Sequence, residues 1–203
     1  MKIGPKYKIA RRLGVPVFEK TQTEKFVVRE TRRAKNARRS KRRGSRSNFA
    51  LQLLEKQKVR YTYGISEKQF SNYVKDALEK KGNPADSLYR SLESRLDNIL
   101  YRAGFAKTRR MARQMASHGH ATVNGVRTTI PSYTLREGDI VAIREGSKGK
   151  TVFENLEERQ IATIPKWLTV DQKKMTATLG TLPSFDVTEN VFSLVSVIEF
   201  YSR

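Results

Sequence analysis

Apolar residues recur at three-to-four spacing through the middle of the chain, which is the period of a helix that packs one face on a core. The stripe consists of Leu88, Leu92, Leu96, Ile99, Leu100 and Ala103. Ser87 is a suitable N-cap, and Gly104 is a suitable stop at the other end. The pattern therefore predicts one helix from residue 87 to residue 103.

A second helix is predicted over residues 109–117, because Thr108 is a suitable N-cap and the helical spacing resumes there. Its inward positions are Met111, Ala112, Met115 and Ala116, and its outward positions are Arg109, Arg110, Arg113 and Gln114. This helix has one apolar face and one polar face that is mostly cationic.

Strand patterns follow this helix. Asn124-Gly125 is a strong signal for a tight hairpin, and the predicted strands are 121–123, 126–130, 140–144 and 165–170. The strand at 140–144 is apolar enough to be covered on both faces. The remaining segments are a loop at 145–152, a short acidic helix at 154–162 and a β-branched, aromatic stretch at 191–201.

The first part of the chain carries weaker patterns. Two helices are predicted, a basic one at 49–63 and another at 67–80 that Ser66 caps. Residues 1–28 show no sustained helix or strand period and indicate an extended arm. Residues 29–46 hold ten Lys or Arg and one acid, so we expect disorder there unless a counter-charge binds.

The charge of the chain changes the picture from fold to partner. The net charge is +21, and the first 60 residues carry 20 basic and four acidic side chains. A charge this large favours a polyanion as partner, which makes nucleic acid the leading candidate. Cysteine is absent, which excludes disulfides and thiolate zinc sites. No apolar leader or membrane-length segment occurs, so we expect a soluble, unexported protein with no membrane partner.

The outward face of the helix at 109–117 is the best candidate for binding phosphate. Arg109 and Arg113 lie ~6 Å apart along the helix axis, and guanidinium groups bind phosphate bidentately. The helix amino terminus at Thr108 adds backbone N–H groups that also bind phosphate. The side chains expected beside this face are His118, His120 and Arg127.

The alternative for these arginines is a solvated face with internal ion pairs. The stretch from Arg102 to Arg136 contains no Asp or Glu. Without an acid in the stretch, contact with nucleic acid is the favoured interpretation.

No sequence pattern supports an enzyme or a bound cofactor. His118-Gly119-His120 lacks a third ligand nearby, so we expect no metal and instead a polar contact or a satisfied histidine. Lys174-Met175-Thr176 faintly resembles a synthetase signature loop, but the chain has no Gly-rich phosphate loop. That resemblance is treated as chance.

The run from Leu92 to Ala106 is similar to the opening of the RNA-binding module named after bacterial small-subunit ribosomal protein four. Its continuation matches at Thr108, Ala112-Arg113-Gln114, Ser117-His118-Gly119-His120 and Val123-Asn124-Gly125. Pseudouridine synthases, tyrosyl-tRNA synthetases and ribosome-rescue factors also carry this module. The module alone therefore implies structured RNA and no particular role.

The flanks decide between these classes. They match the ribosomal protein at Gly4-Pro5-Lys6, Arg11-Arg12, Gly14, residues 54–60, Tyr63-Gly64, Gln69-Phe70, Trp167-Leu168 and residues 199–202. The chain is thus identified as a member of the bacterial small-subunit ribosomal protein four family, in a form without the cysteine-ligated zinc of many relatives. Residues 1–46 must be ordered by other means, and we expect this arm to order mainly on RNA.

The resemblance implies an α+β fold with an inserted α/β RNA-binding domain of antiparallel strands. The expected parts are an extended basic arm at 1–46, a helical domain at 47–90 joined by 190–203, and an α/β domain at 91–189 whose RNA-binding module spans about 92–152. The implied function is structural: direct binding of a multi-helix junction in the 5′ domain of small-subunit ribosomal RNA, which nucleates assembly. Implied partners are ribosomal protein five, with an effect on accuracy, other small-subunit proteins and the chain's own mRNA.

The residues expected to bind RNA follow from the basic arm, the helices and the module together. They are Lys41, Arg42, Arg43, Arg46, Lys58, Arg60, Arg95, Arg102, Lys107, Thr108, Arg109, Arg110, Arg113, Gln114, His118, His120, Asn124 and Arg127. We expect them to contact phosphates and 2′-hydroxyls of RNA recognised by shape. The expected location is the small ribosomal subunit in the cytoplasm.

Two other classes of function carry the same module. A free RNA chaperone or ribosome-rescue factor would leave the small subunit during a salt wash that a structural component survives. An RNA-modifying enzyme would need a catalytic domain larger than the remaining residues.

Overall fold

The computed structural model of the chain describes residues 3–39, 47–150, 153, 164–185 and 190–202. The chain divides into two compact units, Met1–Ala85 with Asp186–Arg203, and Asp86–Phe185. We call them unit 1 and unit 2 and describe each by itself. The α+β class predicted from the sequence is confirmed, since unit 1 is helical and unit 2 contains a sheet.

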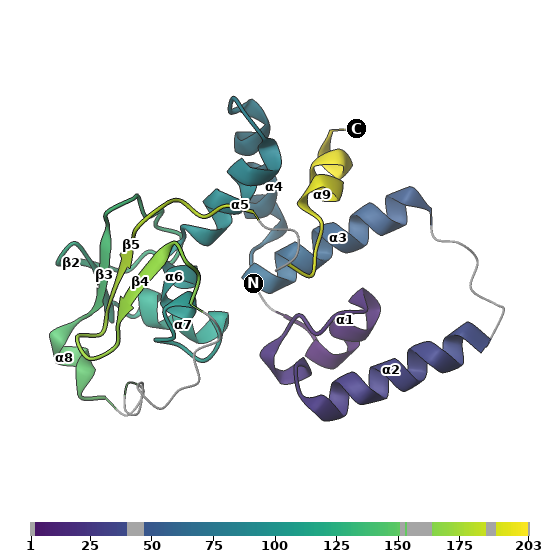
Figure 1. Cartoon of the computed structure of the whole chain (residues 1–203), viewed down its shortest axis with the longest axis horizontal. Helices are drawn as coiled ribbons and strands as arrows, with labels where there is room; N and C mark the ends of the chain where they lie inside the picture. The colour runs from purple at the N-terminus through teal and green to yellow at the C-terminus, as the bar shows by residue number, and fades with distance from the viewer. Residues whose placement is uncertain (1–2, 40–46, 151–152, 154–163, 186–189, 203) are drawn as a thin grey trace. The chain divides into compact units, whose positions relative to one another are not determined.

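Unit 1 consists of helices (Figure 1). Its elements are α1 Lys6–Leu13, the 3₁₀ turn η1 Glu19–Thr21, α2 Glu24–Arg39, α3 Asn48–Tyr63, α4 Glu67–Glu79 and α9 Leu194–Tyr201. Serine caps begin α3, α4 and α9, where the hydroxyls of Ser47, Ser66 and Ser193 accept backbone N–H groups. The last helix packs against α3 and α4, so the end of the chain returns to this unit.

The extended arm predicted for residues 1–28 is wrong where the structure describes it, because α1 and α2 are helices. The buried side chains of this region are few: Ala10, Leu13, Phe18, Thr21 and Phe26. The Thr21 hydroxyl donates to the Phe18 carbonyl at 2.6 Å, and the Tyr7 and Phe26 rings lie 5.6 Å apart. So few buried positions do not produce a sustained period in the sequence.

The expected disorder of residues 29–46 is also wrong as far as Arg39, the end of α2. The helix carries its like charges outward, since Arg29, Arg32 and Arg33 are all exposed. Glu30 relieves part of the repulsion by pairing with Arg33 and with Arg11 of α1. Residues 40–46 lie outside the described part of the chain.

The carboxy-terminal stretch is helical despite its β-branched and aromatic composition. Leu194 and Val197 are buried one turn apart in α9. Burial against α3 and α4 outweighs the weak strand preference of the individual residues.

Unit 2 places two helices on a five-stranded antiparallel sheet (Figure 1). Its helices are α5 Pro84–Glu93, which begins at the end of unit 1, α6 Leu96–Arg102, α7 Arg109–Ser117 and the short α8 Glu145–Lys148. Its strands are β1 Ala121–Val123, β2 Val126–Thr128, β3 Ile140–Ile143, β4 Leu168–Asp171 and β5 Thr176–Leu179, in the order β2-β1-β3-β5-β4. One core joins α6, α7 and one face of the sheet.

The helix predicted at 87–103 is in fact two helices, broken where Arg95 adopts extended backbone. The N–H groups of Leu96 and Asp97 donate to the carbonyls of Tyr133 and Pro131, at 2.9 and 3.0 Å. Arg95 also bridges to Thr134 as a strand would. These bonds to a distant loop replace helical ones, while the predicted apolar stripe is buried as expected.

Other differences in unit 2 concern its second half. The β3 strand is covered on one face only, since Val141 is buried and Ile140 is 46% exposed. The segment predicted as a loop at 145–152 contains α8, and β5 was not predicted. The chance motif at Lys174 belongs to the turn between β4 and β5, where Met175 has a φ of 54°. The helix predicted at 154–162 lies outside the described residues.

The hairpin prediction is confirmed, since Asn124 and Gly125 have φ of 50° and 81° between β1 and β2. Two consecutive positive values are what a type I′ turn requires. Among the described helices, none combines the length and the apolar character needed to cross a membrane.

Candidate nucleic-acid interface

The α7 helix forms the base of the candidate interface. Thr108 begins it as predicted, and its hydroxyl accepts the N–H of Met111 at 3.1 Å. Ala112, Met115 and Ala116 are buried against the core. Met111 is partly buried against the same core, and the other side chains of α7 form a polar face.

A buried carboxylate orients the first cation beside α7. Glu93, at the end of α5, is fully buried, and Arg102 of α6 donates to it through Nε at 2.9 Å and Nη2 at 2.8 Å. Asn98, 2% exposed, also donates to Glu93 at 2.7 Å. The Arg102 side chain remains 26% exposed, so this bidentate pair fixes a guanidinium at the surface.

The same network orients two arginines of α7. Arg109 donates through Nε to the Asn98 side-chain oxygen at 2.9 Å, and its guanidinium lies 4.3 Å from the centre of the Tyr101 ring. Arg113 lies 3.5 Å from the Asp97 carboxylate and keeps 32% of its side chain exposed. The cations thus come to one place from α6 and α7, over acids supplied by α5 and α6.

These contacts correct the argument that no acid is available to the arginines. Glu93 and Asp97 precede the acid-free stretch in the chain, and the fold brings them beneath it. The four arginines at 95, 102, 109 and 113 still outnumber these two carboxylates, so the network remains cationic. Ion pairing here holds guanidinium groups in fixed orientations, which reduces the ordering entropy that an anion must overcome on binding.

A second row of polar groups flanks the arginine network. Lys107, Arg110, Gln114, His118 and Arg127 are all exposed. Arg127 of β2 lies over the backbone of Gly119, where a β-carbon would come within 2.3 Å of its Nε. We call these five residues, together with Arg102, Arg109 and Arg113, the α7 face.

His120 differs from His118 because it is packed into the protein. Its Nδ1 lies 2.9 Å from the Ser147 hydroxyl, and its ring meets Phe153 edge-on. Burial lowers the pKa of His120, and the positive charges of Lys150, His118, Arg144 and Arg127 lower it further. His120 is therefore the satisfied histidine that the sequence allowed, and it supports the edge of the α7 face.

Two predicted RNA contacts have structural roles. Arg95 is fully buried and donates through Nε and Nη2 to Asp97, at 3.0 and 2.8 Å, so it has no surface for a ligand. Asn124 uses its amide to join the hairpin to the start of β3, donating to Asp139 at 2.8 Å and accepting the N–H of Ile140 at 2.9 Å. The complete burial of Arg95 contradicts its predicted contact with RNA, whereas the predicted contact of the exposed Asn124 stays a prediction.

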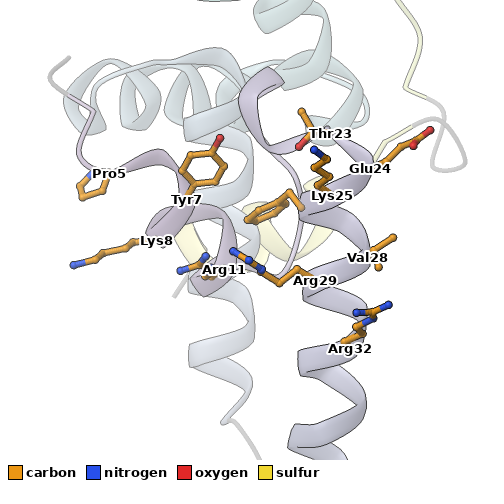
Figure 2. Close-up of a pocket in the computed structure, with 11 residues that line it drawn as sticks. Pro5, Tyr7, Lys8, Arg11, Thr23, Glu24, Lys25, Val28, Arg29 and Arg32 are labelled. Carbon is orange, nitrogen blue, oxygen red and sulfur yellow. The ribbon is translucent and has the colours of Figure 1, made fainter.

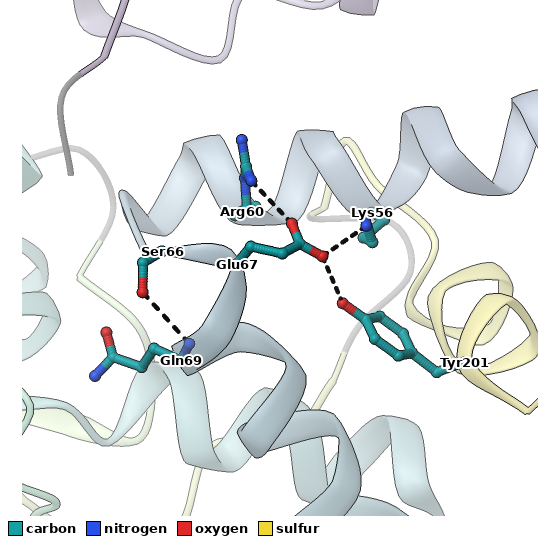
Figure 3. Close-up of polar contacts among 6 residues, drawn as sticks. All are labelled: Lys56, Arg60, Ser66, Glu67, Gln69 and Tyr201. Carbon is teal, nitrogen blue, oxygen red and sulfur yellow. Dashed lines mark hydrogen bonds and ion pairs between the residues drawn. The ribbon is translucent and has the colours of Figure 1, made fainter.

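Two of the residues predicted to bind RNA, Lys58 and Arg60, lie in α3 of unit 1 and pair with carboxylates. Lys58 pairs with Glu55, and Arg60 donates to Glu67 at 2.8 Å. Figure 3 shows the Glu67 carboxylate accepting hydrogen bonds from Arg60, Lys56 and the Tyr201 hydroxyl. Because Tyr201 belongs to α9, Arg60 helps to hold the carboxylate on which α9 packs. The predicted residues Lys41, Arg42, Arg43 and Arg46 lie outside the described part of the chain.

Sequence reasoning missed the residues that orient the cations. Glu93, Asn98 and Tyr101 lie within the run from Leu92 to Ala106 that resembles the module, but the sequence analysis assigned none of them a role. The positions of Glu93 and Asn98 beside the apolar stripe were a usable signal. Polar residues that are buried at such positions are almost always hydrogen-bonded, so a partner for each could have been sought.

Comparison with known proteins adds an independent result. The model of the ribosomal protein S4/S9 N-terminal domain matches residues 1–93, and that of the S4 domain matches residues 94–141. The chain is 43% identical to the small ribosomal subunit protein uS4 of Persephonella marina, over 98% of both chains. It is 40% identical to that of Chromobacterium violaceum, over 99% of this chain and 98% of the relative, and 39% identical to that of Akkermansia muciniphila, over 98% of both.

Proposed function

Because the chain belongs to the uS4 family of small-subunit ribosomal proteins, we propose that it is a structural, rRNA-binding component of the small ribosomal subunit in the cytoplasm. The finer proposal is that it binds a multi-helix junction in the 5′ domain of small-subunit rRNA and nucleates assembly of the subunit body. Ribosomal protein five and other small-subunit proteins are the proposed protein partners, with an influence on accuracy. Binding to its own mRNA is part of the same proposal.

The observation that carries the proposal is the oriented arginine network of the α7 face. Arg102, Arg109 and Arg113 are held by groups beneath them and remain partly exposed above. RNA duplexes present phosphates and 2′-hydroxyls at spacings set by helix geometry, so a rigid cationic surface recognises shape without reading base edges. The high positive charge of the rest of the chain adds affinity that depends on salt.

The experiment compares full-length variants for binding to a transcript of the 5′ domain of small-subunit rRNA. Lys107→Glu with Arg110→Glu reverses two exposed charges and leaves the buried network intact. We expect weaker binding, and a slope of log affinity against log salt that falls by about one for every phosphate that the variant no longer neutralises. Arg109→Glu with Arg113→Glu is expected to weaken binding further, because it also removes the oriented guanidinium groups.

The matched control is Lys173→Glu with Lys174→Glu, which makes the same charge change in the turn between β4 and β5. We expect this variant to bind nearly as well as the wild type. If all three double variants weaken binding equally, the effect is one of net charge and the α7 face is not the interface. A protein that leaves small subunits in a moderate salt wash would contradict the structural role.

A further inference from the structure

A groove of about 1040 Å³ lies between α1 and α2 in unit 1, whereas the α7 face belongs to unit 2 (Figure 2). The Tyr7 ring is 46% exposed on one side of the groove and lies against the ring of Phe26, which is 8% exposed. Val28 adds an aliphatic side chain that is 50% exposed. The groove therefore offers an aromatic face in an apolar setting.

The rim of the groove is cationic. Lys8 comes from α1, and Lys25, Arg29 and Arg32 come from α2. Within the described residues, no carboxylate lies within ion-pair distance of any of these four. Arg11 also lines the groove, but it is paired with Glu30 at 3.2 Å. The one acid in the lining is Glu24, so the groove as a whole attracts an anion.

We propose that this groove takes an unpaired nucleotide of small-subunit RNA, whose base stacks on Tyr7 while its flanking phosphates contact the four cations of the rim. The inference rests on the proposed rRNA-binding function and adds a second, single-stranded contact to it. Bases expose a π-face that stacks on aromatic side chains whatever their sequence, and Lys and Arg beside such a ring hold the backbone.

The dimensions and chemistry favour this occupant over others. A base inside a duplex is covered by its neighbours and cannot reach a ring within a groove. Ligand pockets of ~300–1,000 Å³ hold drug-sized molecules, and a nucleotide is of that size, so the volume of about 1040 Å³ accommodates it. An acidic peptide would satisfy the cations, but it would leave the exposed Tyr7 face without a planar partner.

The first test compares Tyr7→Ala with Tyr7→Phe in the full-length protein, using the same rRNA transcript. Removal of one stacked base is expected to weaken binding by roughly 5- to 150-fold in Tyr7→Ala, with an unchanged salt slope because every phosphate contact remains. Tyr7→Phe keeps the ring and is expected to bind like the wild type. Equal binding by all three proteins would overturn the proposal.

Tyr7 also packs on Phe26, so a second measurement avoids any effect of the substitution on folding. Wild-type protein is crosslinked to transcript containing 4-thiouridine, and the joined peptides are identified by mass spectrometry. We expect a crosslink within residues 5–32. Crosslinks at α7 alone would overturn the groove and leave the proposed function standing, whereas no crosslink at either place contradicts both. A third outcome would also overturn the proposal. If Tyr7→Ala leaves RNA binding unchanged but causes another protein to dissociate from assembled small subunits, the groove binds a protein segment.

Discussion

At the scale of single residues, burial decides what a charged side chain does. Arg95 and Arg110 were both predicted to contact RNA, the first from its place beside the apolar stripe and the second from the outward face of its helix. Arg95 is fully buried against Asp97, whereas Arg110 is exposed on the α7 face. The first supports the fold and the second is available to a ligand.

We expect Arg95→Met to lower the free energy of unfolding of unit 2 by about 3 kcal/mol, because it leaves the buried Asp97 without its main partner. This value is at the low end for a broken buried pair, since Arg113 remains near Asp97. Denaturant unfolding measures the change. The salt slope of RNA binding is expected to stay the same.

The control for this prediction is Arg110→Gln, for which the opposite result is expected: unchanged stability and a salt slope reduced by about one. A reduced salt slope together with unchanged stability in Arg95→Met would contradict this prediction. It would show that Arg95 contacts phosphate and does not support the fold.

At the scale of elements, the junction between α7 and β1 shows how a turn shapes the interface. Gly119 has a φ of 70°, and its missing side chain leaves room for Arg127 from the neighbouring strand. The turn therefore serves both the backbone path and the position of a cation on the α7 face.

Gly119→Ala is expected to destabilise the protein by roughly 1–2 kcal/mol through its left-handed backbone, and to weaken RNA binding by displacing Arg127. Gly125→Ala is the matched control, since Gly125 has a φ of 81° but no atom within 4 Å of its β-carbon position. The two variants are compared by denaturant unfolding and by affinity for the transcript. We expect the two variants to lose similar stability, and only Gly119→Ala to bind RNA more weakly. Equal RNA affinities would show that Arg127 does not contact RNA.

At the scale of the whole molecule, the chain closes unit 1 with its last helix. Glu67 of α4 accepts hydrogen bonds from Lys56 at 2.6 Å, Arg60 at 2.8 Å and Tyr201 at 3.0 Å (Figure 3). Lys56 also lies 4.7 Å from the centre of the Phe200 ring. One carboxylate thus joins α3, α4 and α9, although Glu67 and Tyr201 are 134 residues apart in sequence.

The stability of this junction is expected to depend on pH. Burial alone would raise the pKa of Glu67, but hydrogen bonds from Lys56 and Tyr201, the charge of Lys56 and the bond from Arg60 outweigh it, so the net pKa is lowered. The stabilisation is present above the unfolded value of about 4.3 and is lost as pH falls through the folded pKa. Burial and the Glu67 charge raise the pKa of Tyr201, so its contribution is full below about pH 10 and is lost as pH rises further.

The measurement is hydrogen exchange of residues 194–201 as a function of pH, with exchange rates corrected for intrinsic chemistry. We expect Glu67→Gln to increase exchange at neutral pH and to abolish the acidic transition. Asp76→Asn, at an exposed position of the same helix, is the control and is expected to behave like the wild type. An acidic transition that persists in Glu67→Gln would assign it to another group.

Much of the local structure was predictable because its determinants lie within four residues of each other. The caps at Ser66 and Thr108 and the turn at Asn124-Gly125 occur as predicted, since each depends on a side chain and the backbone beside it. The polar face of α7 was predictable for the same reason. The α1 and α2 helices were not, because the few residues that hold them meet only after the chain has folded.

The sequence by itself determined the α+β class, the family, the polar face of α7 and the strong attraction for a polyanion, all of which follow from local spacing, motif matches and total charge. Only the tertiary structure decided which cations are presented. It buried Arg95, placed Glu93 and Asn98 beneath Arg102 and Arg109, and opened a groove beside Tyr7. The physical reason is that burial and ion pairing depend on neighbours distant in the chain, and these neighbours determine whether a charge faces a carboxylate or a ligand.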